Sequence, residues 1–265
     1  MRKIIDAHCH IYPDKIADRA TAATGDFYSI PFECDGKVST LKKEDEIAGI
    51  THSIVQSVAT APKQVSSINH FIADSVEQSD NLTGLGTLHP DSDNQERDIE
   101  ELISLGLKGV KLHPDIQKFK IDDYRCLKIY ELCEKNNLPI LMHTGDSRYD
   151  YSNPNRLIPI LEIYDNLTII GAHFGGWSIW KEAAKRLNGF EKLYVDTSSA
   201  LYAIKKEEAE EIISLYGADR VLFGTDFPMW SPKEELDRFM ALDLNDEDRE
   251  KILWKNSAKL FNIKL

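Results

Sequence analysis

The sequence lacks the features that mark several common classes of protein. Its 265 residues contain no run of about 20 apolar residues, the length that spans a bilayer, so we expect no membrane partner. The N-terminus has no apolar stretch of the kind found in secretory signals, and the four cysteines show no Cys-x-x-Cys spacing. We therefore expect a cytoplasmic protein whose thiols stay reduced.

Two kinds of binding site are also missing from the sequence. The net charge is −12, from 32 basic and 44 acidic residues, which argues against nucleic acid because phosphate neutralisation needs clustered Lys and Arg. The first apolar run is followed by His-Cys-His-Ile-Tyr-Pro instead of a Gly-rich phosphate turn, so an open dinucleotide-binding sheet is excluded.

Short apolar runs alternate with stretches of helical apolar spacing along the whole chain, with no linker or repeat between them. Such alternation is typical of parallel strands with right-handed crossovers, and a closed (β/α)8 barrel needs about 250 residues. We predict one domain over 1–265, an α/β protein with a (β/α)8 (TIM) barrel. Its predicted strands lie near residues 3–10, 52–59, 82–88, 107–113, 138–144, 168–173, 192–197 and 220–225.

Histidines and one aspartate stand at the ends of several of these runs, namely His8, His10, His143, His173 and Asp226. In a barrel the catalytic groups come from the carboxyl ends of the strands. Imidazole and carboxylate together are ligands for a divalent metal that leave a position open for water. The pattern therefore predicts a metal enzyme.

Strand geometry places four of these residues around one point. Because residues two apart share a side of a strand, we expect His8 and His10 to point into the barrel mouth while Ala7 and Cys9 face the helices. Closure of the last strand against the first brings Asp226 beside the pair, and His143 arrives from across the ring. Zn²⁺ suits this set best, with Mn²⁺ or Fe²⁺ as alternatives.

The fourth predicted strand adds Lys111 and His113, which lie two residues apart and therefore on the same side of the strand. We expect both to point inward while Val110 and Leu112 pack against helices. A buried lysine is costly unless it is paired. We therefore expect Lys111 and His113 to contact the substrate or to hydrogen-bond the metal ligands.

Aromatic residues gather in the loops that should cover the mouth, and two loop residues are candidates for substrate binding. Arg148 can bind a carboxylate in a bidentate manner, and Trp177 can form an apolar wall. Packing of the loops alone remains an alternative explanation for each of these aromatic residues.

The sequence resembles the amidohydrolase superfamily, and within it the amidohydrolase-related branch, which also contains nonoxidative decarboxylases. The resemblance extends over nearly the whole chain, in five segments that occur in order. They are Asp-Ala-His-Cys-His (6–10), Gly-Val-Lys-Leu-His-Pro (109–114), Met-His-Thr-Gly (142–145), Ala-His-Phe-Gly-Gly (172–176) and Phe-Gly-Thr-Asp-Phe-Pro (223–228).

The resemblance implies that His8, His10, His143 and Asp226 bind one metal ion. It also implies that His173 acts near the reacting group, either as a general acid or base or by polarising a carbonyl or the metal-bound water. Binuclear relatives carry a carbamylated lysine at the position of Lys111. Whether Lys111 is modified stays open, because mononuclear relatives manage without the bridge, and we expect one ion.

This ligand set predicts hydrolysis of an amide, lactone or ester bond in a small carboxylated molecule by metal-activated water, with Asp226 as the base. Nonoxidative decarboxylation of an aromatic or dienoic acid is the alternative, and a non-catalytic metal-binding protein is a more remote one. The expected partner is a small-molecule substrate, and a homodimer is left open.

Overall fold

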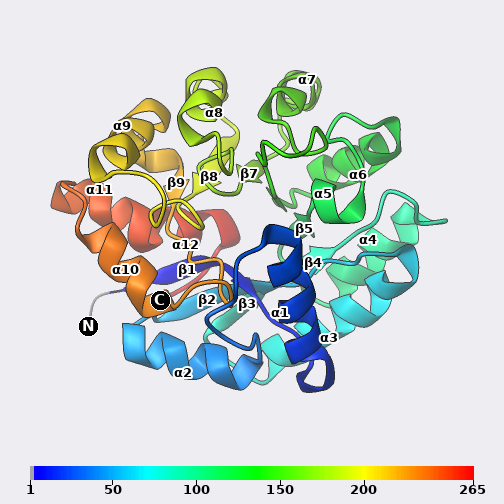
Figure 1. Cartoon of the computed structure of the whole chain (residues 1–265). Coiled ribbons are helices and arrows are strands. Elements are labelled where there is room, and N and C mark those ends of the chain that lie inside the picture. Colours follow the sequence, from blue (N-terminus) through cyan, green and yellow to red (C-terminus); the bar gives the residue numbers. More distant parts are fainter. Residues whose placement is uncertain (1–2) are drawn as a thin grey trace.

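Parallel strands form the centre of the computed structural model, which describes residues 3–265 and leaves the first two residues of the predicted domain outside (Figure 1). The strands are β1 (Ile5–His10), β2 (His52–Gln56), β3 (Leu82–Gly84), β4 (Gly86–Thr87), β5 (Val110–Leu112), β6 (Ile140–Met142), β7 (Ile169–Gly171), β8 (Leu193–Asp196) and β9 (Val221–Leu222). They pair in the orders β1-β2-β3 and β4 through β9.

Two junctions turn these sheets into a closed ring. Only Leu85 separates β3 from β4, and its N–H donates to the carbonyl of Val55 on β2, so the two short strands occupy one position in the ring. At the other junction the Asp226 N–H donates to the His8 carbonyl at 2.9 Å. The molecule is therefore the predicted (β/α)8 barrel, because β3 and β4 together count as one of its strands.

Helices surround the strands on the outside of the ring (Figure 1). No helix within residues 3–265 is both long enough and apolar enough to cross a membrane. The α-helices are α1 (Asp14–Tyr28), α2 (Val38–Ala48), α3 (Val65–Glu77), α4 (Gln95–Ser104), α5 (Pro114–Gln117), α6 (Tyr124–Lys135), α7 (Leu157–Ile163), α8 (Trp180–Leu187), α9 (Lys206–Tyr216), α10 (Pro232–Met240), α11 (Asp246–Glu250) and α12 (Asn256–Phe261).

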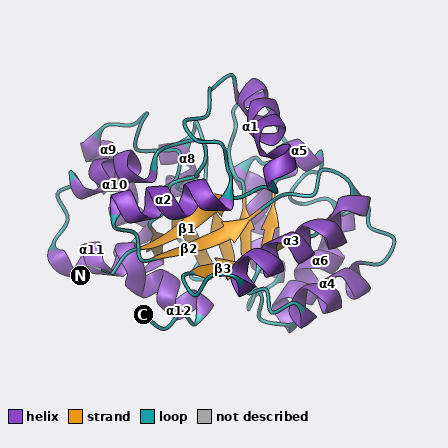
Figure 2. Cartoon of the chain, turned by 90° about the horizontal axis from the view of Figure 1, so that it is seen from below, coloured by secondary structure: helices purple, strands orange, loops and turns teal. Residues whose placement is uncertain are grey.

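The two ends of the barrel are closed in different ways. Figure 2 shows α12 beneath the strands and α1 standing out on the opposite side, where the strands end. Phe261 of α12 packs into the apolar interior of the barrel, so the lower part is a filled core. The interior strand residues of this core are Ile5, Ala7, Ile54, Leu85, Leu141, Ile170 and Leu222.

Strand parity holds on β5 and fails at one residue of β1. Val110 and Leu112 pack in the outer core beneath the helices, as predicted. Ala7, which was expected to face the helices, packs in the barrel interior instead, so that prediction was wrong. The pairing of β1 with β2 shifts register between Asp6 and Cys9, and such a bulge breaks strict alternation.

A buried carboxylate lies behind the bulge. Asp45 of α2 is 2% exposed, and its Oδ2 accepts a hydrogen bond from Ser53 at 2.7 Å while its Oδ1 has no partner. Burial, together with the nearby Asp6 carboxyl, raises the pKa of Asp45 to about 8. Because the native state then binds a proton that the unfolded chain releases near pH 4, this residue's contribution to stability falls as pH rises from about 4 to about 8.

We predict that Asp45→Asn becomes more stable relative to the natural protein as the pH rises from 5 to 8.5, because asparagine never ionises. The gain in the free energy of unfolding should reach at least about 1 kcal/mol, since one pKa unit corresponds to 1.36 kcal/mol. Urea unfolding at both pH values measures it. Asp74→Asn, at an exposed position of α3, is the control, and an Asp45→Asn gain independent of pH would contradict the prediction.

Candidate metal centre

Three of the predicted metal ligands meet where β1 and β9 end. The Nε2 atoms of His8 and His10 are 3.2 Å apart. Asp226 Oδ1 lies 3.3 Å from Nε2 of His8 and 3.6 Å from Nε2 of His10. One donor atom from each residue thus fits within 4.8 Å of the others, which is a compact set of two imidazoles and one carboxylate.

Backbone strain accompanies this cluster. Asp226 has a φ of 64° and His173 a φ of 60°, both in the left-handed region that residues with a Cβ rarely adopt. Such a conformation costs about 1–3 kcal/mol and persists only where the surrounding structure imposes it.

A second carboxylate holds the ring of His8 from behind. Asp196, at the end of β8, accepts a hydrogen bond at Oδ2 from Nδ1 of His8 at 2.9 Å. Its Oδ1 accepts the backbone N–H of His173, also at 2.9 Å. Since Nδ1 of His8 donates to this carboxylate, its Nε2 is the nitrogen that faces His10, Asp226 and the Nζ of Lys111. A carboxylate behind a ligating histidine is the usual arrangement in metal sites.

His143, the fourth predicted ligand, lies in a neighbouring group with His113 and Asp115. Its Nδ1 is 3.0 Å from Nε2 of His173, and its ring stacks on that of His113 at a centroid distance of 4.0 Å. Its Nε2 is buried without a hydrogen-bond partner. The structure therefore does not bring His143 into the compact set, and its role as a ligand stays a prediction.

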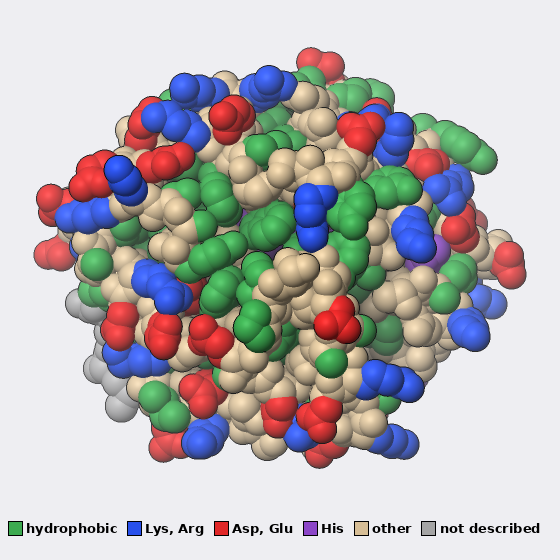
Figure 3. Space-filling view, in the orientation of Figure 1, with side chains coloured by type: hydrophobic (Ala, Val, Ile, Leu, Met, Phe, Trp, Pro, Cys, Tyr) green, Lys and Arg blue, Asp and Glu red, His purple; other side chains and the backbone are tan. Residues whose placement is uncertain are grey.

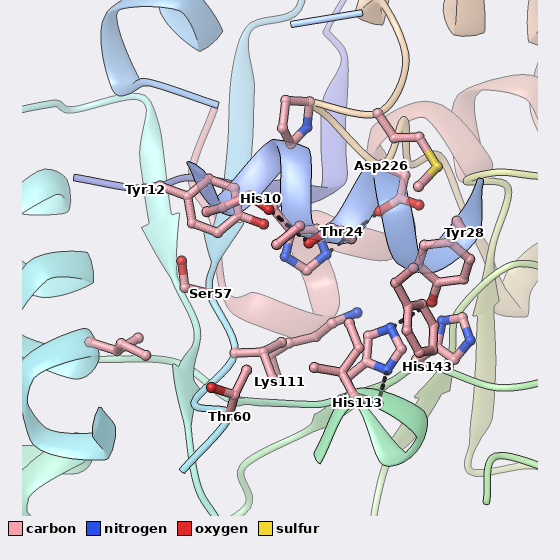
Figure 4. A pocket seen from close by; sticks show the side chains of 18 of the residues that line it. His10, Tyr12, Thr24, Tyr28, Ser57, Thr60, Lys111, His113, His143 and Asp226 are labelled. Atoms are coloured by element: carbon pink, nitrogen blue, oxygen red, sulfur yellow. Dashed lines mark hydrogen bonds and ion pairs between the residues drawn. The ribbon is translucent and has the colours of Figure 1, made fainter. Parts of the chain in front are cut away.

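Lys111 and His113 both line the cavity above the cluster, as expected from their parity. In Figure 4 the Lys111 side chain ends between the rings of His10 and His113, and its Nζ lies 2.9 Å from Nε2 of His8. The hydroxyl of Tyr28 lies 2.8 Å from Nε2 of His113. Burial raises the pKa of Tyr28 well above its usual value, so the tyrosine keeps its proton. Nδ1 of His113 accepts the Ile116 N–H, so the neutral ring carries its proton on Nε2 and donates it to the Tyr28 hydroxyl.

These residues fit a divalent cation. Burial holds the pKa of His10 and of His143 well below the usual histidine value, so both rings are neutral and offer lone pairs. The unpartnered Nε2 of His143 is a buried acceptor that a cation would satisfy, and the Nε2 atoms of His8 and His10, 3.2 Å apart, could both bind one cation.

Charge in the cluster is concentrated on few groups. Burial raises the pKa of Asp226, but the nearby His8 and His173 outweigh that effect and its net pKa lies below the usual range. Burial lowers the pKa of Lys111 to about 8 and that of His173 to about 4. At neutral pH the cluster therefore contains an ionised Asp226, a mostly protonated Lys111 and a neutral His173.

The cluster opens into a cavity of about 670 Å³, over which apolar side chains gather in the middle of the face in Figure 3. Trp177, predicted to contact the substrate, is part of its wall. Tyr28 packs edge-on against Trp177 at a centroid distance of 5.2 Å. Aromatic rings thus cover the ligand cluster on the side of the loop after β7.

Arg148, predicted to anchor a carboxylate of the substrate, is not among the lining residues. Its guanidinium donates to both carboxylate oxygens of Asp146, at 2.9 and 2.7 Å, and to the carbonyl of Phe27 at 2.8 Å. It also lies within 5.5 Å of the ring centroids of Phe27, Tyr28, Tyr149 and Trp177. In this arrangement Arg148 ties α1 to the loop after β6, and its role in substrate binding stays a prediction.

Two carboxylates of the site were missed in the sequence. Asp196 stands at the end of a predicted strand, the same signal that identified the histidines. Asp115 follows His113 and Pro114, and its Oδ2 lies 3.4 Å from Nε2 of His143. Burial raises the pKa of Asp115 to about 6. Strand-end position alone could have found Asp196, whereas Asp115 lies in a helical turn that no pattern indicated.

Comparison with known proteins gives one family and many similar folds. The family model described as Amidohydrolase matches residues 5–263. No curated protein matches the chain. A solved structure of an uncharacterised TIM-barrel protein from Bordetella bronchiseptica is 22% identical, with a TM-score of 0.82 and coverage of 98% of each chain.

Two further similar structures carry names that describe different reactions. A dihydroxybenzoic acid decarboxylase from Polaromonas, with bound manganese and 2-nitroresorcinol, is 17% identical, with a TM-score of 0.75 over 99% of this chain and 97% of the other. A putative 2-pyrone-4,6-dicarboxylic acid hydrolase from Pseudomonas putida is 18% identical, with a TM-score of 0.71 over 99% and 98%. At these identities the likeness shows the barrel fold.

We predict that Asp196→Asn weakens binding of Zn²⁺ or Mn²⁺ by about 10- to 100-fold, because the ring of His8 loses the carboxylate that orients it. Competition against a chromophoric chelator measures the affinity. Asp98→Asn, a buried carboxylate on α4 away from the cavity, is the control for general destabilisation. Complete loss of binding by a folded Asp196→Asn protein would instead identify Asp196 as a ligand, in the group it forms with His8 and His173.

Proposed function

The chain belongs to the amidohydrolase family, and from this premise we propose that it is a metal-dependent hydrolase of an amide, lactone or ester bond in a small carboxylated molecule. The family and the similar structures include both hydrolases and decarboxylases. The observation that carries hydrolysis is the ionised Asp226 carboxylate, which is buried among metal-ligand lone pairs and faces the cavity. A carboxylate in this state can accept a proton from water.

One divalent ion would be held by His8, His10 and Asp226, which form one compact group, and we propose His143 of the neighbouring group as the fourth ligand. Zn²⁺ suits two or three imidazoles and a carboxylate best, although a similar structure contains manganese. Such an ion supplies Lewis-acid polarisation of a substrate oxygen and lowers the pKa of water from 15.7 to about 7.

Asp226 is positioned to act as the general base. Ser199 donates to Asp226 Oδ2 at 2.6 Å, which leaves Oδ1 toward the histidines. The serine fixes the carboxylate plane, so the lone pairs of Oδ1 face the space where water would lie. Proton transfer to a positioned base contributes about 10²- to 10⁴-fold to the rate of such reactions.

Lys111 and His173 complete the proposed catalytic groups. The ammonium of Lys111 lies in a buried site where a positive charge stabilises developing negative charge far more than it would in water. His173 donates from Nδ1 toward the carbonyl of Ser198 at 3.0 Å, which leaves its Nε2 as an acceptor near His143. Once the bond from Nδ1 of His143 is broken, Nε2 of His173 would receive the proton that Asp226 takes from water and pass it to the leaving atom.

Decarboxylation is a second candidate, and the apolar cavity wall favours it. Removal of water destabilises a substrate carboxylate relative to the transition state, in which its charge spreads into the rest of the molecule. Phe27, Tyr28 and Trp177 would provide such surroundings. In that reaction one of the same groups would have to protonate carbon, which the ionised state of Asp226 disfavours.

We predict close to one transition metal ion per chain when the protein is purified without chelator, and loss of that ion in the His8→Ala, His10→Ala double variant. Inductively coupled plasma mass spectrometry measures both. His70→Ala, at an exposed position of α3, should keep the ion. Two ions per chain would restore Lys111 as a bridging ligand, and none in the natural protein would contradict the proposal.

We predict that His173→Ala keeps the ion and loses at least about 100-fold in turnover, because it removes the proton-transfer group and no donor of the compact set. Metal analysis and steady-state kinetics separate the two effects. Loss of the ion in this variant would make His173 a ligand.

The reaction class is tested by offering the metal-loaded protein lactones, esters and amides of carboxylated molecules, and aromatic and dienoic carboxylic acids. Hydrolysis predicts that one oxygen from ¹⁸O-labelled water enters the product. Evolution of carbon dioxide without incorporation of the label would overturn the hydrolase in favour of the decarboxylase.

A further inference from the structure

The cavity extends beyond the ligand cluster along one whole face of α1. Lining residues recur on this helix at intervals of three or four, which places them on a single side from its first turn to its last. At a rise of 1.5 Å per residue, the stripe from Ile16 to Tyr28 is about 18 Å long. On α1 its apolar members are Ile16, Ala20, Ala23 and Phe27.

The facing wall of this extension is apolar in part, because Ile68 and Phe71 lie there beside the polar Gln64 and Ser67. Ile68 and Phe71 of α3 line it and are only half-buried, and Ile16 of α1 is 36% exposed. Apolar side chains that line a hollow without filling it are typical of a ligand groove. The inner end of the groove is marked by Tyr28, which contacts His113 of the site.

Two exposed cations are among the residues that line the same cavity, although the chain as a whole carries −12. Arg19 of α1 and Lys118, just after α5, line the cavity and are exposed, and neither forms a side-chain ion pair or hydrogen bond within residues 3–265. The acidic lining residues are Asp115 and Asp226, both in the inner histidine groups. Nothing acidic in the lining therefore neutralises these two cations.

Resting on the proposed function, we propose that the substrate is an elongated molecule with three parts. Its reacting bond lies at the ligand cluster, its apolar body lies between α1 and α3, and an anionic group at its far end binds Arg19 and Lys118. These two cations replace Arg148 as the anchor, because the guanidinium of Arg148 is already paired with Asp146.

The anion is tested by calorimetry on the metal-loaded protein, with linear α,ω-dicarboxylates and monocarboxylates of equal chain length as probes. Above a threshold length the dicarboxylate should bind about three- to tenfold more tightly than its partner, the range expected for exposed ion pairs. The Arg19→Ala, Lys118→Ala double variant should abolish this difference. Lys15→Ala, an exposed cation on α1 outside the cavity, should preserve it.

The apolar groove is tested by filling it. Ala20→Phe should weaken binding of long probes by at least about tenfold and spare the shortest ones, because a phenyl ring would occupy the space between α1 and α3. Ala22→Phe places the same ring on the face of α1 turned away from this cavity, so it should change the binding of neither the long nor the short probes. Thermal melting verifies that each variant is folded.

Three results would overturn the inference: no binding of any probe by the folded protein, a dicarboxylate advantage that survives loss of both cations, or equal effects of the two phenylalanine variants. The binding pattern does not depend on turnover. A protein with this pattern that hydrolyses no lactone, ester or amide would contradict the proposed reaction and support the substrate shape. Hydrolysis without dependence on chain length or on Arg19 and Lys118 would contradict the substrate shape alone.

Discussion

Closure of the barrel between β9 and β1 is the constraint on which the site depends. The hydrogen bond from the Asp226 N–H to the His8 carbonyl joins segments from opposite ends of the chain, and it places the Asp226 carboxylate against the two imidazoles of β1. Asp6 reinforces the junction by accepting the N–H and the hydroxyl of Thr225. The left-handed backbone at Asp226 is tolerated because these bonds hold the preceding side and the bond from the His10 N–H to the Phe227 carbonyl holds the following side.

Burial then decides which groups of the cluster carry charge. Desolvation keeps His10, His143 and His173 neutral, so their nitrogens remain available as lone pairs or proton acceptors. The nearby His8 holds the pKa of Asp196 below its usual range despite burial, so this carboxylate is ionised like Asp226. Two buried, ionised carboxylates thus lie beside the predicted metal ligands, where a divalent cation would offset their charge.

Much of this arrangement could be predicted from the sequence, because it follows from the periods of strands and the geometry of barrels. Alternation indicated the barrel, and parity placed Lys111 and His113 in the mouth. Parity could not anticipate the register shift that turns Ala7 inward, since a bulge depends on pairing with β2. The sequence pattern also could not predict whether His143 shares a metal with His8 and His10, because the orientation of a ring at a strand end is set by neighbours such as Asp115 and His173.

Arg148 shows why loop residues are harder to interpret than strand residues. Its charge predicted a carboxylate partner, and it has one, but the partner is Asp146, only two residues away. Short-range pairing of this kind leaves no periodic trace in a sequence.

The pairing of Arg148 with Asp146 connects two parts of the cavity wall. By donating to Phe27 as well as to Asp146, Arg148 fastens the last turn of α1 to the loop that follows β6, the strand before His143. The histidine and carboxylate groups of the candidate site therefore lie at the ends of barrel strands, whereas much of the cavity wall lies on α1. Substitutions on the cavity face of α1 are expected to change which molecules fit without moving a strand end, so the proposed substrate choice and the proposed chemistry are separable in this fold.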